Sequence, residues 1–247
     1  MTADESTPTP LETAPHVLIV HGFGATPEDH WFPWLARTLP RAERITLPDP
    51  LTPEADRWVP QVAEALERLG DGTAVVAHSL GNATSLQALR TLAAEGRPVR
   101  LSAFVGVAPF VSPVPPTGDP ELDAFLVGHD GAAPAQHAFF AGLDLPALRP
   151  QLGAVRVLRS NDDPIVPARL SDEVAAALGV QTELVAGAGH FLASDGLVQL
   201  PVLLDGAGPD DAAAPHRTAP GAAARDGTAP DDTARDGACP DSAMGGR

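Results

Sequence analysis

The stretch TAVVAHSLGNATSLQALRTLAAEG, residues 73–96, decides how the rest of the chain is interpreted. Its first half is a short apolar run, typical of a buried strand, and its second half has the spacing of a helix that ends at a glycine. Between the two, the strand stops abruptly on Ser79, which stands between a histidine and a leucine-glycine turn. A strand, a small-x-Ser-x-Gly turn and a helix in this order indicate a nucleophile elbow.

In such a turn, the residues two before and two after the serine nearly touch, so both have to be small. Here they are Ala77 and Gly81. The usual pattern has glycine at both places, so Ala77 is a departure, although a mild one because alanine is also small. The turn would lift the Ser79 hydroxyl clear of the sheet, at the N-terminus of the following helix, where a developing negative charge is stabilised. We therefore predict that Ser79 is a nucleophile.

A serine hydroxyl needs a general base, and the base needs an acid that orients it. In folds with this elbow, the order along the chain is serine, acid, histidine, each at the end of a strand. RVLRSNDDPIVP (residues 156–167) places an acidic pair just past one strand, and His190 follows the next strand. Asp163 is the predicted acid because it directly precedes the Pro-Ile-Val-Pro bend. For Asp162 we favour a turn-capping role.

An oxyanion formed at Ser79 needs two backbone N–H donors. One is expected from Leu80, the residue after the nucleophile, and the other from the loop after the first strand, HGFG (residues 21–24). Within this loop Phe23 is the predicted donor. The flanking Gly22 and Gly24 would let the backbone come close to the reacting atoms.

The remaining histidines and aromatic residues near these motifs have weaker signals. We expect His78 to pack under the elbow and His21 to order the oxyanion loop. Together with His30 they lack the ligand spacing of a metal site, so neither a metal nor another cofactor is predicted. A tryptophan is more often a core residue than a substrate contact, and Trp31 is the best candidate for an exception because it closely follows the oxyanion loop. Phe110 is the other candidate for substrate contact.

Apolar runs alternate with helical patterns over residues 16–205, which predicts a mostly parallel sheet covered on both faces, a three-layer α/β/α fold. Strands are expected within residues 16–22, 42–48, 73–79, 101–108, 154–160 and 182–188. Helices are expected within residues 28–39, 51–70, 81–96, 169–179 and 195–205. Pro60 should delay or kink the second of these helices.

Three segments fall outside this alternation. Residues 109–152 are rich in proline, glycine and phenylalanine and too long for an ordinary connection, so we expect a cap over a cleft, or alternatively an irregular packed insertion. Residues 1–15 are expected to form a flexible arm. Residues 206–247, rich in Ala, Gly, Pro and Asp, lack hydrophobic periodicity and are expected to form a disordered tail.

Composition limits the classes of partner. The formal net charge of −16 argues against nucleic acid or an anionic membrane surface, because both are bound through basic patches. No apolar run approaches a membrane span and the N-terminus lacks the features of a secretory signal, so a cytoplasmic protein is expected. With one cysteine, Cys239, the chain cannot form an intramolecular disulfide. The sequence leaves the oligomeric state open.

Several of these stretches resemble the α/β-hydrolases, and more narrowly the small serine hydrolases that include retinoblastoma-binding protein nine and its bacterial relatives. The matching stretches are HGFGATPEDHWFPWL, AHSLGN, SNDDPIVP, GAGHF and DGLVQLPVLLD, within about residues 16–205. The resemblance implies a compact fold that lacks the first two strands of larger hydrolases. It also implies Ser79 as nucleophile, Asp163 as acid and His190 as base. An L-x-C-x-E segment is absent, so no pocket-protein partner is expected.

These observations together predict a serine hydrolase that cleaves small carboxylic esters through an acyl-enzyme. An amidase or aminopeptidase with the same triad is the first alternative. The second is a non-catalytic interaction module built on a hydrolase scaffold. Fold-level resemblance supports acyl hydrolysis but does not name the acyl group.

Overall fold

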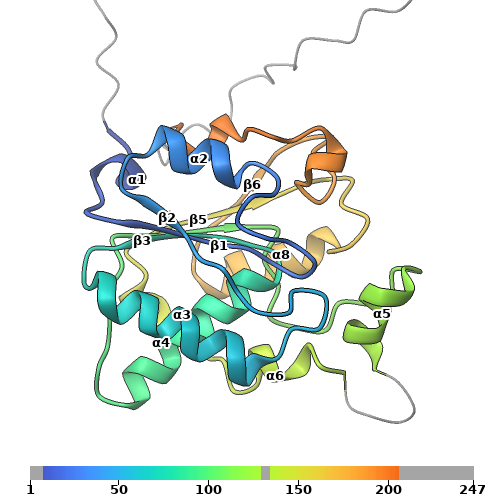
Figure 1. Cartoon of the computed structure of the whole chain (residues 1–247), viewed down its shortest axis with the longest axis horizontal. Helices are drawn as coiled ribbons and strands as arrows, with labels where there is room; N and C mark the ends of the chain where they lie inside the picture. The colour runs from blue at the N-terminus through green and yellow to red at the C-terminus, as the bar shows by residue number, and fades with distance from the viewer. Residues whose placement is uncertain (1–7, 129–133, 206–247) are drawn as a thin grey trace, which may run out of the picture. The chain divides into compact units, whose positions relative to one another are not determined.

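The structure is a computed structural model, and it describes residues 8–128 and 134–205. Six parallel strands form one sheet in the order β2-β1-β3-β4-β5-β6 (Figure 1). The strands are β1 (Val17–Val20), β2 (Ala42–Arg44), β3 (Ala74–His78), β4 (Ala103–Val107), β5 (Ala154–Arg159) and β6 (Thr182–Leu184). Each lies within a segment that the sequence predicted as a strand, so the predicted parallel sheet is confirmed.

Helices cover both faces of this sheet. On one face lie α3 (Ala55–Leu69), α4 (Leu80–Ala94) and α8 (Ala168–Ala177), and on the other lie α1 (Pro10–Thr13) and α2 (Phe32–Thr38) (Figure 1). Alternate side chains of β3 enter opposite cores, Val75 and Ala77 on the α3 side and Ala74 and Val76 on the α2 side. The fold is therefore the expected three-layer α/β/α sandwich. No helix among the described residues is long and apolar enough to cross a membrane.

Pro60 does not delay helix α3, which begins at Ala55 and continues to Leu69 with the proline inside it. The proline lies on the exposed side, while Trp58, Val62 and Leu66 are buried. Burial of that face against α4 holds the turn in helical form, although the proline supplies no N–H to it.

At the N-terminus the flexible arm expected over residues 1–15 is corrected for the part that the structure describes. Residues 10–13 form the short helix α1, and a capping box joins Thr9 and Glu12 through two hydrogen bonds. Leu11 is buried in the same core as α2. The buried side chain of Leu11 and the capping box therefore hold this segment against the core that contains α2. Residues 1–7 and the tail expected over 206–247 lie outside the described residues.

The helix expected within residues 195–205 is also corrected. Only two single turns of 3-10 helix form there, Ala193–Asp195 and Pro201–Leu203. Gly196 adopts a left-handed conformation with φ of 84°, which ends the first turn. Pro201 begins the second turn, and because it has no N–H it could not continue a helix from the preceding residues.

In the described parts of the insertion, residues 109–128 and 134–152, lie three short helices, α5 (Pro120–Val127), α6 (His137–Phe140) and α7 (Leu145–Leu148), and a 3-10 turn, Arg149–Gln151. Helices α6 and α7 pack against α4, whereas α5 stands apart from the layers in Figure 1. Phe125 of α5 contacts Phe139 of α6 at 5.9 Å between ring centroids. The insertion thus extends the α3–α4 core towards the carboxyl end of the sheet.

Candidate active site

The predicted site residues come together because every strand runs in the same direction. Ser79 follows β3, Asp163 lies in the loop after β5, and His190 lies in the loop after β6. The carboxyl ends of parallel strands lie at one edge of a sheet, where sites are commonly built. The loop after β1, which carries Phe23, reaches the same edge.

Ser79 has the backbone conformation of a strained turn. Its φ is 51° and its ψ is −123°, values that residues other than glycine rarely adopt. Its N–H donates to the carbonyl of Val107 on the neighbouring strand β4 at 2.9 Å. The elbow expected between β3 and α4 is therefore present.

Gly81 lies against the end of β1. A Cβ atom at this position would lie 2.5 Å from the carbonyl oxygen of His21 and 2.6 Å from that of Val20. Helix α4 therefore approaches the end of β1 so closely that only glycine fits at residue 81. Any side chain at residue 81 would push the elbow away from the oxyanion loop.

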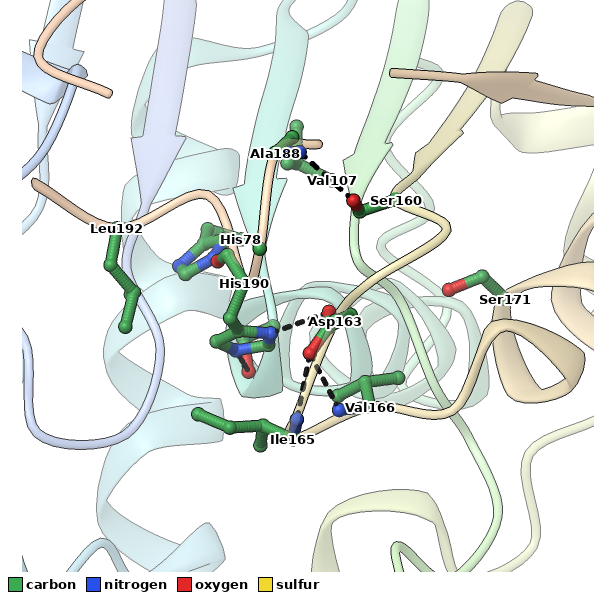
Figure 2. A network of polar contacts seen from close by, with 12 residues as sticks. His78, Val107, Ser160, Asp163, Ile165, Val166, Ser171, Ala188, His190 and Leu192 are labelled. Carbon is green, nitrogen blue, oxygen red and sulfur yellow. Dashed lines mark hydrogen bonds and ion pairs between the residues drawn. The ribbon is translucent and has the colours of Figure 1, made fainter. Parts of the chain in front are cut away.

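Ser79, His190 and Asp163 form a continuous hydrogen-bonded chain. The distance from His190 Nε2 to Ser79 Oγ is 3.0 Å, and that from His190 Nδ1 to Asp163 Oδ2 is 2.8 Å (Figure 2). The other carboxylate oxygen of Asp163 accepts the N–H groups of Ile165 and Val166 at 2.8 and 2.9 Å. Because the carboxylate accepts from Nδ1, Nε2 is free to accept the serine proton.

Asp162 joins two loops and does not make the turn-capping bonds expected of it, which Asp163 makes instead to the N–H groups of Ile165 and Val166. The Asp162 carboxylate accepts hydrogen bonds from the Ser160 hydroxyl and from the N–H of Gly189, the latter at 3.0 Å. The Ser160 hydrogen bond, followed by that of Gly189, lowers the pKa of Asp162. Ser160 also accepts the N–H of Ala188 at 3.1 Å (Figure 2). These bonds tie the loop after β5 to the loop that carries His190.

The two expected oxyanion donors have no competing acceptor in the described part of the chain. Leu80 is the first residue of α4, and neither its N–H nor that of Phe23 donates to an acceptor among residues 8–128 and 134–205. Gly22 brings the loop against the elbow, because a Cβ there would lie 2.9 Å from the Cβ of Ser79. This arrangement can receive an oxygen atom that carries negative charge.

His21 orders the oxyanion loop, as expected. The N–H of Leu47 donates to its Nε2 at 3.1 Å, so the ring proton is on Nδ1, which donates to the carbonyl of Gly22 at 3.0 Å. Burial lowers the pKa of His21, which favours this neutral form.

The two candidate substrate contacts are corrected. Trp31 has 0% of its surface exposed and packs on Phe32, and Phe110 is 3% exposed within the core beneath the insertion. Neither side chain has surface to offer a substrate. Instead, the half-buried Phe23 stacks on Phe125 of α5 at 5.3 Å between ring centroids.

Leu51 is a further apolar residue beside the oxyanion loop, and sequence reasoning missed it. It is 55% exposed and lies next to Gly24, whose N–H donates to the carbonyl of Pro50 at 2.8 Å. Its only sequence signal is a leucine in a proline-rich loop, and this does not distinguish it from a core residue.

Two polar residues of the site were also missed, the buried Asn82 and the exposed Asp195. Asn82, in the first turn of α4, donates through Nδ2 to the carbonyls of Ser79 and Val107 at 3.0 and 3.1 Å. Asp195 accepts the N–H of His190 at 2.9 Å and so fixes the loop from its far side. A polar residue directly after the small-x-Ser-x-Gly turn was the available sequence signal for Asn82. No group of three or more metal-ligating side chains gathers anywhere in the described ranges.

Comparison with known proteins agrees with this geometry. A family model described as serine hydrolase matches residues 17–205. YdeN of Bacillus subtilis, named as a hydrolase, is 29% identical over 193 residues, which cover 76% of this chain and 92% of YdeN. The crystal structure of the ydeN gene product has a TM-score of 0.64 at 26% identity, covering 76% of this chain and 94% of that one.

A second solved structure supports the fold alone. It is a YdeN-like hydrolase from Pectobacterium atrosepticum, with a TM-score of 0.50 at 18% identity over 73% of this chain and 82% of that one. The family match spans every strand and every residue of the hydrogen-bonded chain described above. The chain therefore belongs to the serine hydrolase family and has the α/β-hydrolase fold.

Proposed function

We propose that this chain is an esterase that cleaves small carboxylic esters through an acyl-enzyme formed on Ser79. The observation that carries the proposal is the unbroken hydrogen-bonded chain from Asp163 through His190 to the hydroxyl of Ser79. A hydroxyl in this position can lose its proton to Nε2 as its oxygen attacks a carbonyl carbon.

In the first half of the reaction, Ser79 Oγ attacks the ester carbonyl while His190 Nε2 accepts the hydroxyl proton. The carbonyl oxygen becomes negatively charged and accepts hydrogen bonds from the N–H groups of Phe23 and Leu80. Asp163 stabilises the imidazolium through the Nδ1 proton. The tetrahedral intermediate collapses, His190 gives its proton to the alkoxide, and the alcohol leaves the acyl group bound to Ser79.

In the second half, a water molecule gives a proton to His190 and attacks the acyl carbonyl through the same oxyanion arrangement. Collapse of this intermediate returns the proton to Ser79 Oγ and releases the carboxylic acid. The cycle needs only groups of this chain and water.

The surroundings of the serine support a small, largely apolar substrate. Ser79 is 6% exposed and His190 4%, so only a slim group reaches the reacting atoms. The side chains at the oxyanion loop are apolar, namely Phe23, its neighbour Phe125 and the exposed Leu51. Such surfaces favour alkyl or aryl groups over charged ones.

The test is labelling by a fluorophosphonate probe, compared between the wild type and Ser79→Ala. The probe reacts with an activated serine whatever the natural substrate is. We expect labelling of the wild type and none of the variant, and hydrolysis of short-chain aryl esters that the variant loses. A folded wild type that resists the probe would refute the proposal and favour the interaction module. Faster cleavage of aminoacyl amides than of matched esters would replace esterase with amidase.

A further inference from the structure

A histidine outside the hydrogen-bonded triad holds the backbone of His190. His78, the residue before Ser79, approaches the carbonyl oxygen of His190 with its Nε2 atom at 2.9 Å. The ring centroids of the two histidines lie 5.0 Å apart, and Figure 2 shows them side by side. His78, which precedes Ser79 in the sequence, is therefore hydrogen-bonded to His190, the residue that must accept the serine proton.

The chemistry of this contact fixes the protonation state of His78. A carbonyl oxygen can only accept, so Nε2 carries a proton and donates it. Nδ1 is buried and has no partner among the described residues, so a second proton there would have no acceptor. Burial lowers the pKa of His78 well below its ordinary value, and the nearby His190 and His30 act in the same direction. The ring is a neutral donor.

Aromatic rings enclose His78, and Trp31 is buried because it is one of them. The rings of Trp31, Phe32 and His30 lie 6.2, 5.9 and 5.8 Å from it between centroids. His30 also accepts the N–H of Ala193 through Nδ1 at 3.0 Å, so the same cluster holds the His190 loop at a second point.

We propose that His78 is a positioning residue for the general base, and that its Nε2–H bond fixes the distance between His190 Nε2 and Ser79 Oγ. The inference rests on the proposed function of Ser79 and His190. Because the elbow and the base loop follow different strands, their spacing needs a cross-link, and His78 is joined covalently to one and hydrogen-bonded to the other. Misplacement of a reacting group by about 1 Å can lower a rate about 100-fold.

A neutral ring is needed at this place as well as a donor. His190 becomes positively charged when it takes the serine proton, and a second charged imidazole in contact with it would oppose that step. The enclosure by Trp31 and Phe32 prevents this by excluding water from His78.

The test compares two substitutions of His78, one that keeps an N–H donor to the His190 carbonyl and one that removes it. In His78→Gln the amide Nε2 occupies nearly the place of the imidazole Nε2 and can still donate to the carbonyl, whereas His78→Leu fills the space without a donor. His16→Gln, at an exposed histidine, is the control for the loss of a histidine. For each protein we would measure kcat, KM, the fluorophosphonate labelling rate and hydrogen exchange over residues 188–195.

We expect His78→Leu to lower kcat and the labelling rate about 10- to 100-fold, with KM changed less than about threefold. Hydrogen exchange over residues 188–195 should become faster. His78→Gln should recover most of the rate and protect the loop. The inference is overturned if folded His78→Leu keeps the wild-type kcat, or if both variants lose the same activity at equal thermal stability. If the wild type proves unreactive, the proposed function fails, and hydrogen exchange still decides whether His78 holds the loop.

Discussion

Ser79 is held in an unfavourable backbone conformation by neighbours on helix α4 and strand β4. A left-handed, non-glycine residue persists only where its surroundings fix it, and the surroundings here are hydrogen bonds to the elbow. The Ser79 carbonyl accepts from both the N–H and the side chain of Asn82, and the Ser79 N–H donates to Val107. Asn82 joins these two backbones with one amide group.

We expect Asn82→Asp to destabilise the protein by more than Asn82→Ala. Alanine removes two hydrogen bonds, each worth about 0.5–1.5 kcal/mol. Aspartate places a carboxylate against the carbonyl oxygens of Ser79 and Val107, which repel it, in a site with no solvent exposure. Urea unfolding of the wild type and both variants measures which substitution lowers the free energy of unfolding more.

The matched control for this prediction is Asn161→Asp. Asn161 is exposed, and its side-chain oxygen only accepts, from the N–H of Gly187 at 2.9 Å, so aspartate keeps the bond. The Asn161→Asp protein should therefore unfold at a urea midpoint near that of the wild type. Equal losses at residues 82 and 161 would show that the Asn82 amide does not hold the elbow.

At this scale, the sequence predicted the residues that follow strand ends and missed those defined by contact. Ser79, Asp163 and His190 were predicted because their order and positions after strands indicate a triad, and their side chains do meet. The bond between His78 and His190 spans 112 positions of sequence, so no spacing rule reveals it. Trp31 was placed at the substrate because proximity along the chain does not distinguish a rim from a core.

Among the elements, the insertion over residues 109–152 has the most direct connection to the oxyanion loop. Phe125 stacks on Phe23 and on Phe139, Phe139 contacts Trp58, and Trp58 contacts His21. This circuit of rings begins and ends in the oxyanion loop. Helix α5 is thereby tied to the backbone N–H that we assign to the oxyanion.

We expect Phe125→Ala to lower kcat as well as stability. The loss of a buried phenylalanine costs about 3–5 kcal/mol in typical cores. Phe23 would also lose the ring against which it packs, so the loop that carries the proposed oxyanion donor would be held less firmly. Thermal unfolding and aryl-ester kinetics below the melting transition separate the two effects.

Val127→Ser is the control on the same helix, because Val127 is 45% exposed. It should leave kcat and the melting temperature close to those of the wild type. A Phe125→Ala protein that is less stable but turns over at the wild-type rate would mean that α5 packs on the loop without positioning it.

Elements were predicted well where burial alone defines them, and poorly where caps and breakers do. The central strands β1, β3 and β4 are buried along their whole length, and periodicity detects such apolar runs directly. The C-terminal helix failed because Gly196 and Pro201 interrupt an otherwise suitable apolar pattern. The docking of α1 depends on one capping box and on Leu11, a signal too local to outweigh the surrounding prolines.

The whole molecule carries a formal net charge of −16, yet its response to mild acid depends on neutral groups inside it. Burial, the largest cause in each case, lowers the pKa of His21, His30 and His78. All three make hydrogen bonds near the elbow or the His190 loop. Acid should therefore act first on the region that the site occupies.

We expect the free energy of unfolding to fall as the pH is lowered from about 6.5. An unfolded histidine takes up a proton near its ordinary pKa of 6.5, whereas buried His78 takes one up only at much lower pH. Over that interval the unfolded chain binds more protons, so stability decreases as the pH falls, by up to about 1.4 kcal/mol per pH unit for His78 alone. Asp162, whose pKa is also lowered, would lose its contribution only below its ordinary value of 3.8.

Urea unfolding at pH 8, 7, 6 and 5 tests this expectation on the wild type, His78→Gln and His16→Gln. Above pH 6.5 the stability of the wild type should change little with pH, and below it the midpoint should drop. His78→Gln cannot take up the proton, so its profile should be flatter, while His16→Gln should follow the wild type because that side chain is exposed in the folded protein. Parallel profiles for wild type and His78→Gln would show that His78 is protonated equally in both states, and hence that its ring is not the neutral donor inferred above.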